Sequence, residues 1–301
     1  MVEVLGIDIG GTNVKISTVN KTGEILDKQK YPTKPLYEEG IFLHNFISIV
    51  QEQLHKNKKI AKVGIGVPGT ISKDRKSIIN LPNIPGMNDT PIISELEKNF
   101  PQHEFYLEND ATAAALGEYT FSEIKLPDDI TFITLGTGVG GGAILNGKVF
   151  AGGDGNAMEL GHIIASNGNT IEKNIGKQGL LSYANALLEE STLDSLLKNE
   201  QEFGTKEIIK AAKKGDEIAL KVFKYMGKYL GECIVSSIRI LDIKFILIGG
   251  GVSKAGSYIE ESMWDVIHTY LPKSYTDNLE IKIATKGNEA GVLGAAALCF
   301  Q

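Results

Sequence analysis

The sequence is poor in cysteine and has no excess of basic residues. It contains 2 cysteines in 301 residues, Cys233 and Cys299, and both lie in apolar stretches. A disulfide scaffold is therefore excluded, and we expect two buried, free thiols in a reducing compartment, the cytoplasm. The 31 basic and 37 acidic side chains give a net charge of −6. This balance argues against a nucleic acid as partner, because nucleic-acid-binding proteins usually present a basic face.

Long apolar segments are also missing. No run approaches the roughly 20 apolar residues that cross a bilayer, so no membrane partner is expected. The chain begins directly with a strand pattern at residues 3–9 and shows no secretory signal pattern. A hydrophobic content of 42% and a charged content of 23% are ordinary for a globular protein. The length predicts about two domains.

Two loops rich in glycine and threonine are the most informative feature that is present. Residues 6–13 read Gly-Ile-Asp-Ile-Gly-Gly-Thr-Asn, and residues 135–142 read Leu-Gly-Thr-Gly-Val-Gly-Gly-Gly. Glycine lets backbone N–H groups approach an anion, and the hydroxyls of Thr12 and Thr137 add donors. One such loop is equally well a hairpin turn. Two of them between apolar strand patterns favour a duplicated clamp on a phosphate chain, with Asp8 holding magnesium.

Hydrophobic periodicity predicts a repeated order of elements. In the first half we expect strands at 2–9, 13–20, 25–32, 61–67 and 104–107, helices at 38–55, 91–99 and 111–119, and a loop at 77–90. The three hairpin-like strands, then a helix and a further strand, suggest a mixed sheet of the ribonuclease-H type. In the second half we expect a strand at 129–135, a glycine loop at 136–142, a hairpin at 143–150, helices within 205–240, a strand at 244–248 and a helix at 288–299.

Glu108-Asn109-Asp110 at a predicted helix start is the candidate for acid–base chemistry. A sugar hydroxyl is a poor nucleophile, and its attack on a phosphoryl group requires a base that accepts its proton. Asp110 could be that base, and Asn109 could orient the sugar. The structural alternative is that Asn109 or Asp110 simply caps the helix.

Two further clusters have both a functional and a structural interpretation. Glu159 and His162 are three residues apart and share a side in a helix or tight turn, which suits adjacent sugar hydroxyls. Alone, they are more often a solvated pair. The glycines of Gly249-Gly250-Gly251-Val252-Ser253 leave room for adenine or ribose, although a plain strand-to-helix turn would look the same.

Two common nucleotide-binding folds are excluded. Residues 136–141 match Gly-x-Gly-x-x-Gly, but this dinucleotide fingerprint must open a helix, whereas here a strand and a hairpin follow. A Rossmann oxidoreductase is therefore rejected. The sequence has no Gly-x-x-x-x-Gly-Lys-Ser/Thr motif, so a P-loop enzyme is rejected as well.

The ordered motifs together resemble the ROK family of sugar kinases and repressors over essentially the whole chain. They are the sequences at 8–13, 66–69, 108–111, 135–142, 159–162 and 249–253. The resemblance implies an α/β, actin/hexokinase-like (duplicated ribonuclease-H-like) two-domain ATPase fold. It implies a small domain at 1–110 completed by a closing helix at 288–301, and a large domain at 111–287. The implied reaction is the transfer of phosphate from ATP, with magnesium, to a hexose, and family members are commonly homodimers.

The resemblance also assigns roles to residues. Asp110 would be the catalytic base, and Asp8 would lie near magnesium. The sugar would contact Gly69, Asn83, Asn109, Asp110, Glu159 and His162. ATP would contact Gly10, Gly11, Thr12, Asn13, Thr137 and Gly138 through its phosphates, and Gly250 and Gly251 through its adenosine.

The chain departs from the family pattern at its zinc motif. Glu172, Asn174 and Gly179 stand where the family's zinc cysteines would fall after His162, and Leu181 or Ser182 replaces a glutamate that usually touches the sugar. One histidine without a thiolate makes a poor structural zinc site. We therefore predict no zinc, and the identity of the sugar becomes more open.

The motifs and the composition favour or disfavour four functions. A hexose kinase acting on the 6-hydroxyl, foremost a glucokinase, is the leading one, followed by a kinase for N-acetylmannosamine or N-acetylglucosamine. A sugar-responsive repressor would need a helix-turn-helix domain before the first strand, for which residue 2 leaves no room. An actin-like or chaperone-type ATPase would keep the phosphate loops without needing Asn109-Asp110 and Glu159-His162.

Overall fold

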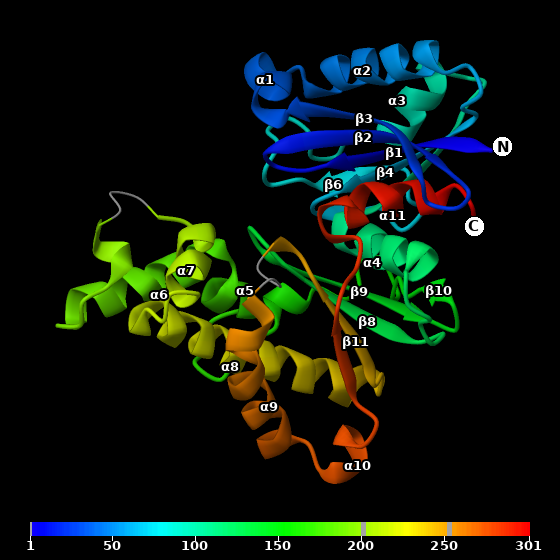
Figure 1. The fold of residues 1–301 in the computed structure, drawn as a ribbon. Helices are drawn as coiled ribbons and strands as arrows, with labels where there is room; N and C mark the ends of the chain where they lie inside the picture. Colours follow the sequence, from blue (N-terminus) through cyan, green and yellow to red (C-terminus); the bar gives the residue numbers. More distant parts are fainter. Residues whose placement is uncertain (1, 200–202, 252–254) are drawn as a thin grey trace. The chain divides into compact units, whose positions relative to one another are not determined.

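The computed structural model describes residues 2–199, 203–251 and 255–301 (Figure 1). Contacts within the chain divide it into two compact units. The first comprises Met1–Asp128, Gly142–Met158 and Thr285–Gln301, and the second comprises Asp129–Gly141 and Glu159–Ala284. Residues 111–128 and 142–158 thus group with the N-terminal part of the chain, and the predicted domain division at residue 110 stays a prediction.

The first unit contains a five-stranded mixed sheet in the order β3-β2-β1-β4-β7. Strands β1, β2 and β3 form an antiparallel meander, and β4 and β7 run parallel to β1 and β4 respectively. This is the predicted sheet of the ribonuclease-H type. The bounds are β1 Glu3–Ile9, β2 Asn13–Asn20, β3 Ile25–Pro32, β4 Lys62–Val67, β5 Thr70–Ile71, β6 Ile78–Asn80 and β7 Glu104–Asn109. The helices are α1 Thr33–Tyr37, η1 Glu38–Gly40, α2 Phe42–Lys56, α3 Ile92–Asn99, α4 Asp110–Phe121, η5 Gly287–Glu289 and α11 Ala290–Leu298.

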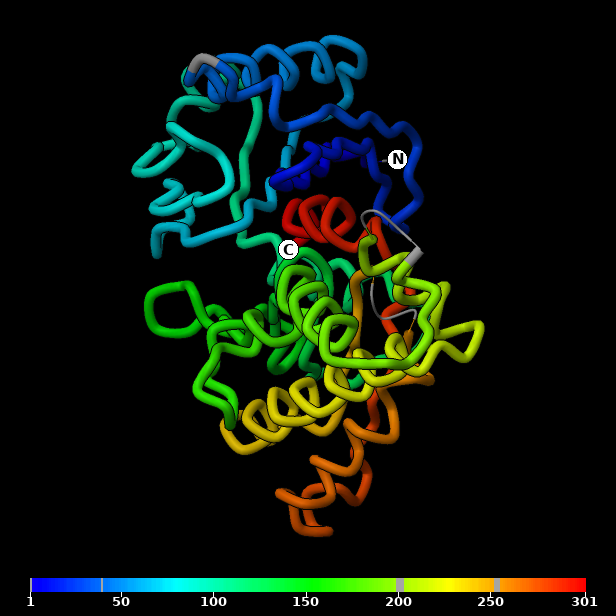
Figure 2. Tube along the Cα trace, turned by 90° about the vertical axis from the view of Figure 1, so that its left-hand side faces the viewer, coloured from blue at the N-terminus to red at the C-terminus, as the bar shows by residue number. Residues whose placement is uncertain are grey.

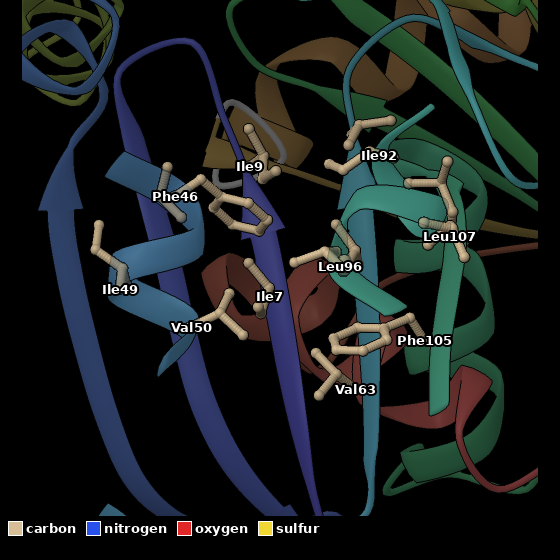
Figure 3. Packing of buried hydrophobic residues seen from close by; sticks show 14 of the residues in the cluster. Ile7, Ile9, Phe46, Ile49, Val50, Val63, Ile92, Leu96, Phe105 and Leu107 are labelled. Atoms are coloured by element: carbon tan, nitrogen blue, oxygen red, sulfur yellow. The ribbon is translucent and has the colours of Figure 1, made fainter. Parts of the chain in front are cut away.

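Apolar side chains fill the space between this sheet and helices α2 and α3 (Figure 3). Ile7 and Ile9 of β1 and Phe46 of α2 are fully buried within this core. Helix spacing brings Phe46, Ile49 and Val50 to one side of α2, facing the strands. This core holds β1 and β4 in place. It therefore also positions the ends of these strands, where the loops described below begin.

Helix α11 covers the sheet through glycine contacts. Figure 2 shows this helix, in red, beside the N-terminal strands, in blue. A Cβ atom on Gly6 would collide with the carbonyl oxygen of Val292, and one on Gly64 with that of Ala295, so glycine is needed for this approach. The carboxylate of Glu118 in α4 accepts hydrogen bonds from the backbone N–H groups of Thr285 (2.9 Å) and Lys286 (2.7 Å), which ties α4 to the segment before α11.

A second five-stranded sheet has the order β10-β9-β8-β11-β12. Its strands are β8 Ile130–Leu135, β9 Val139–Leu145, β10 Lys148–Val149, β11 Phe245–Gly249 and β12 Glu280–Ile283. The remaining helices are η2 Leu160–His162, α5 Ile171–Ile175, α6 Lys177–Glu190, η3 Leu196–Asn199, α7 Thr205–Ala212, α8 Glu217–Leu241, α9 Gly256–Tyr270 and α10 Lys273–Thr276. The predicted hairpin at Asn146-Gly147 is confirmed, and both residues have the positive φ of a two-residue turn.

Three predicted elements are corrected by the structure. The loop at 77–90 contains strand β6, because Ile78 is buried and exchanges backbone hydrogen bonds with Thr90. The glycine loop at 136–142 ends at residue 138, where β9 begins. Gly142, within β9, serves packing rather than turning, since a Cβ atom on it would lie 2.7 Å from that of Ala115. The helix expected at 38–55 starts at Phe42 and follows the separate short helices α1 and η1.

Both cysteines are buried free thiols, as expected. Burial raises the pKa of each thiol to about 12. No helix among residues 2–199, 203–251 and 255–301 is long and apolar enough to span a membrane.

Candidate functional site

Residues 10–12, the first glycine loop, join β1 to β2. The N–H of Gly10 donates to the carbonyl oxygen of Asn13 over 3.0 Å, which closes the turn. Thr33 braces the loop: its hydroxyl donates to the carbonyl of Gly10 (2.6 Å) and its N–H to that of Thr12 (3.0 Å). Thr33 is fully buried, whereas Gly11 and Thr12 are exposed. The loop is therefore held in place while its glycine and threonine stay open to a ligand.

Asp8, near the end of β1, forms an ion pair with Lys15 at 2.9 Å. Its side chain is only 14% exposed, and a Cβ atom on Gly291 of α11 would lie 2.8 Å from its Oδ2. In the described part of the chain, no group of three or more His, Cys, Asp or Glu side chains could hold a metal ion. Magnesium at phosphate sites takes only one or two protein carboxylates and completes its shell with phosphates and water, so a single Asp8 suits it.

Residues 136–138, the second glycine loop, join β8 to β9 in a turn whose closing hydrogen bond spans one residue fewer than that of the first loop. The N–H of Gly136 donates to the carbonyl oxygen of Gly138 over 3.0 Å. The brace comes from α5 and α6: the Glu172 carboxylate accepts the N–H of Val139 (2.9 Å), and the N–H of Lys177 donates to the carbonyl of Thr137 (3.0 Å). Thr137 itself is exposed, as Thr12 is in the first loop.

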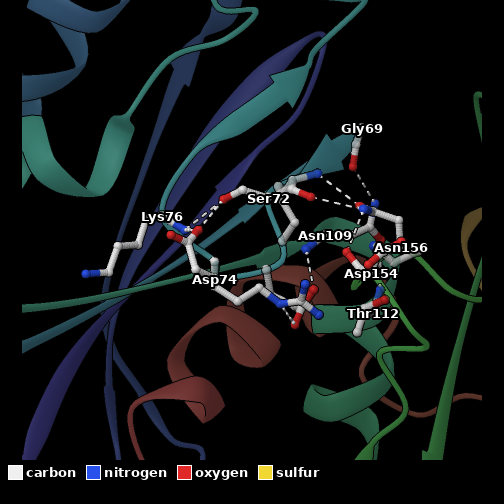
Figure 4. A network of polar contacts seen from close by, with 12 residues as sticks. Gly69, Ser72, Asp74, Lys76, Asn109, Thr112, Asp154 and Asn156 are labelled. Carbon is white, nitrogen blue, oxygen red and sulfur yellow. Dashed lines mark hydrogen bonds and ion pairs between the residues drawn. The ribbon is translucent and has the colours of Figure 1, made fainter.

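Asn109 and Asp110 lie where β7 passes into α4 (Figure 4). The side chain of Asn109 is the helix cap, because its Oδ1 accepts the N–H groups of Ala111 (2.9 Å) and Thr112 (3.1 Å). Its Nδ2 donates to the carbonyl oxygen of Gly69 over 3.1 Å. Asp110 is the first helical residue, and its Oδ1 accepts the N–H of Ala111 over 2.8 Å. The helix dipole favours the ionised carboxylate at this position, which is the form that a general base needs.

In the same compact unit, Gly69 lies beside Asn109 and Asn83 lies beside the first glycine loop. Gly69 has a φ of 131°, and a Cβ atom there would collide with the carbonyl oxygen of Asn80, so only glycine fits. Asn83 is a neighbour of the first glycine loop, since a Cβ atom on Gly11 would lie 3.3 Å from the Cβ of Asn83. Residues predicted for the sugar and for ATP thus meet along this edge of the unit.

Glu159 and His162 come together across the single turn η2, as predicted. The Glu159 Oε2 lies 3.9 Å from the His162 Nε2, and the side chains are 47% and 70% exposed. Partial burial raises the pKa of Glu159, the charge of Glu172 raises it further, and His162 opposes both effects. These polar groups are accessible and can exchange hydrogen bonds with hydroxyl groups.

The third glycine cluster adjoins the second glycine loop. Gly250 has a φ of 85°, and a Cβ atom on it would collide with the carbonyl oxygen of Leu135, the last residue of β8. Gly250 therefore belongs beside the strand that enters the loop, and Gly251 is exposed. Val252 and Ser253, which complete the motif, lie outside the described residues.

The segment at residues 172–182, where the family's zinc motif is missing, is stabilised by side-chain hydrogen bonds of Asn174. Asn174 is buried and exchanges side-chain amide hydrogen bonds with Asn167 (2.8 and 3.1 Å), and its Oδ1 also accepts the hydroxyl of Tyr225 (2.9 Å). Burial raises the pKa of Tyr225 to about 12, so this hydroxyl stays a donor. The absence of zinc stays a prediction.

Sequence reasoning missed the side chains that support the site. Thr33, Glu172 and Arg75, which pairs with Glu108 at 3.1 Å, carry no motif of their own. Hydrogen bonds from Thr33 and Glu172 reach 23 and 33 residues along the chain. No local pattern reports contacts over such separations.

Comparison with known proteins relates the whole chain to one family. The sequence model of the ROK family matches residues 4–301 of this chain. A glucokinase from Halalkalibacterium halodurans is 33% identical over 99% of this chain and 94% of its own length. An N-acetyl-D-glucosamine kinase from Haemophilus influenzae is 30% identical over 97% of this chain and 98% of its own length.

Solved structures agree with this relationship. A structure from Cytophaga hutchinsonii has a TM-score of 0.93 and 38% identity, covering 99% of this chain and 100% of its own. A ROK family glucokinase from Streptomyces griseus, solved in complex with glucose and AMPPNP, has a TM-score of 0.81 and 29% identity over 98% of both chains. The predicted actin/hexokinase-like α/β fold is thereby confirmed.

Proposed function

Because the chain belongs to the ROK family, we propose that it is a hexose kinase that transfers the γ-phosphoryl group of ATP to the 6-hydroxyl of glucose. One observation carries this assignment. Asp110 is fixed at the N-terminus of α4, beside the Asn109 cap that is hydrogen-bonded to Gly69, in the same unit as the first glycine loop. A carboxylate with that support suits a base for a hydroxyl substrate.

Asp110 accepts the proton of the sugar 6-hydroxyl during attack. The sugar oxygen forms a bond to the γ-phosphorus while the bond from that phosphorus to the oxygen bridging it to the β-phosphate breaks. ADP leaves with the electron pair of the broken bond, and the proton resides on Asp110. Asn109 orients the sugar, with its own amide held by Gly69.

The two glycine loops bind the phosphates of ATP. Their backbone N–H groups and the hydroxyls of Thr12 and Thr137 are donors for phosphate oxygens. Asp8 would hold magnesium, which neutralises phosphate charge when bound. Gly250 and Gly251 lie against the adenosine in this proposal.

Glu159, His162 and Asn83 complete the sugar site, and exclusion of water protects the phosphate from hydrolysis. We expect a homodimer in the cytoplasm. N-acetylglucosamine or N-acetylmannosamine is the second candidate substrate, favoured by the similarity to the Haemophilus influenzae kinase. Residues 172–182 differ from the family pattern, so contacts to the sugar can differ as well, which agrees with that alternative.

ADP release with magnesium and ATP, measured against glucose, N-acetylglucosamine, N-acetylmannosamine, fructose and mannose, tests the function. Asp110→Asn is the matched control, because it keeps the shape and removes the base. We expect glucose to give the highest turnover, and the variant to lose about 100- to 10,000-fold in kcat with near-normal sugar binding.

Two results would overturn parts of this proposal. A fully active Asp110→Asn variant refutes the base assignment. ADP release that no sugar increases refutes the kinase and favours an actin-like ATPase.

A further inference from the structure

A partly buried ion pair includes Glu108, two residues before the proposed base. The Arg75 Nε donates to the Glu108 Oε2 over 3.1 Å, and the two side chains are 22% and 7% exposed. The other oxygen of Glu108 accepts the N–H of Asn109 over 2.9 Å. Arg75 is therefore linked, through one carboxylate, to the backbone of the residue that caps α4 and precedes Asp110.

The same guanidinium also lies against a second segment of this unit, the loop at residues 151–158. A Cβ atom on Gly155 would collide with the Arg75 Nη1, and Gly155 has a φ of 92°. Asn156 exchanges two hydrogen bonds of 3.0 Å with the backbone of Ile71, and Asp154 pairs with Lys73 at 3.3 Å (Figure 4). In the sequence, this loop leads directly into Glu159 and His162.

An ion pair at this place costs free energy, because its charged groups are largely removed from water. Burial raises the pKa of Glu108, and the Asn109 N–H and the Arg75 guanidinium counter that effect. The Arg75 Nη1 is buried and has no hydrogen-bond partner among the described residues. Apolar side chains of similar volume commonly stabilise such a place as well as an ion pair does. The advantage of the charged pair is its fixed geometry.

We propose that Arg75 is a positioning residue for the sugar site, an inference that rests on the proposed function. It sets Asn109 and Asp110 through Glu108, and it sets the loop at 151–158 through its contact with Gly155. The first glycine loop is braced by Thr33 instead, whose hydroxyl bonds to Gly10, whereas the Arg75 side chain bonds to Glu108. The effect of Arg75 is therefore confined to the sugar.

Arg75→Gln tests this with Lys73→Gln as the matched control, since Lys73 lies on the same turn in an exposed ion pair. We expect Arg75→Gln to lower kcat/KM for the sugar about 10- to 100-fold, the effect of misplacing reacting groups by about 1 Å. KM for ATP should stay within about twofold, because uniform ATP binding is untouched. Arg75→Lys should recover part of the loss, and Lys73→Gln should match the wild type.

Gly155→Ala is the second variant, in case Arg75→Gln does not fold. It displaces the guanidinium and keeps every charge, so we expect the same loss for the sugar alone. A purely structural role predicts a lower melting temperature with unchanged kinetic constants well below it, and that result overturns the inference. Equal losses for sugar and ATP also overturn it. A wild type without sugar-dependent turnover instead refutes the proposed function.

Discussion

The two glycine loops are equally long and both contain glycine and threonine, but their supports differ. In both, three residues join consecutive strands, and the N–H of the first loop residue donates over 3.0 Å to a carbonyl oxygen, that of Asn13 in the first loop and that of Gly138 in the second. The first loop is braced by the neutral hydroxyl of the buried Thr33. The second is braced by the carboxylate of Glu172, which accepts the N–H of Val139.

Two similar loops therefore do not require the same kind of supporting side chain. An anionic brace forms a stronger hydrogen bond than a hydroxyl, but it also places negative charge near the proposed phosphate site. The acidic residue near the first loop, Asp8, is paired with Lys15 at 2.9 Å, and no basic side chain of the described residues is paired with Glu172. The carboxylate near the first loop is therefore ion-paired, whereas among the described residues the one at the second loop is not.

Asp8→Asn should have the largest effect, because it removes from the first loop alone the charge proposed to hold magnesium. We expect kcat to fall about 100- to 1,000-fold, since a bound metal contributes several kcal/mol to phosphoryl transfer. Turnover is measured over a range of magnesium concentrations. Lys15→Met, which frees Asp8, is the control and should keep most activity. Wild-type turnover by Asp8→Asn at low magnesium would contradict the assignment.

Removal of the anionic brace should have the next largest effect. Glu172→Ala leaves the Val139 N–H without its acceptor, and we expect KM for ATP to rise about 10-fold, given that hydrogen bonds to charged groups are worth about 1.5–3 kcal/mol. Glu172→Gln keeps an acceptor and removes the charge, so its KM for ATP should equal or fall below that of the wild type. A Gln variant as impaired as the Ala variant would show that charge, rather than the brace, matters.

A methyl group added to each loop tests the two supports separately. A Cβ atom on Gly138 would collide with the Glu172 carboxylate, whereas one on Gly11 would lie 3.3 Å from the Cβ of Asn83. We expect Gly138→Ala to raise KM for ATP about 5-fold by displacing Glu172, and Gly11→Ala to raise it less than about twofold. A double-mutant cycle with Glu172→Ala checks the cause. Additive effects of the two changes would mean that the alanine acts independently of Glu172.

Thr33→Val should give only a small kinetic change, because the brace of the first loop is neutral. Loss of the 2.6 Å hydrogen bond to Gly10 should lower the free energy of unfolding by about 1–2 kcal/mol, while the N–H of Thr33 still holds Thr12. KM for ATP should change less than about threefold. Thermal unfolding and ATP kinetics measure both quantities. A change in KM as large as that of Glu172→Ala would remove the distinction between the braces.

The turns themselves were readable in the sequence, because glycine and threonine between apolar strands report a local backbone need. The ribonuclease-H order of the first sheet followed from the hydrophobic periodicity of its strands and helix. The sequence could not decide between Asn109 and Asp110 as the cap, since both side chains carry an acceptor oxygen. It hid β6, whose Ile78 stands within a stretch rich in turn residues. The braces Thr33 and Glu172 and the pair Arg75–Glu108 depend on contacts that only the folded chain creates.

The most direct test of the account is the fate of the phosphate. Phosphorus NMR of a reaction with glucose, ATP and magnesium resolves sugar phosphate, ADP and inorganic phosphate in one sample. The account predicts one glucose 6-phosphate for each ADP formed, and little inorganic phosphate. Inorganic phosphate appearing in step with ADP, or phosphate on another hydroxyl of the sugar, would contradict it.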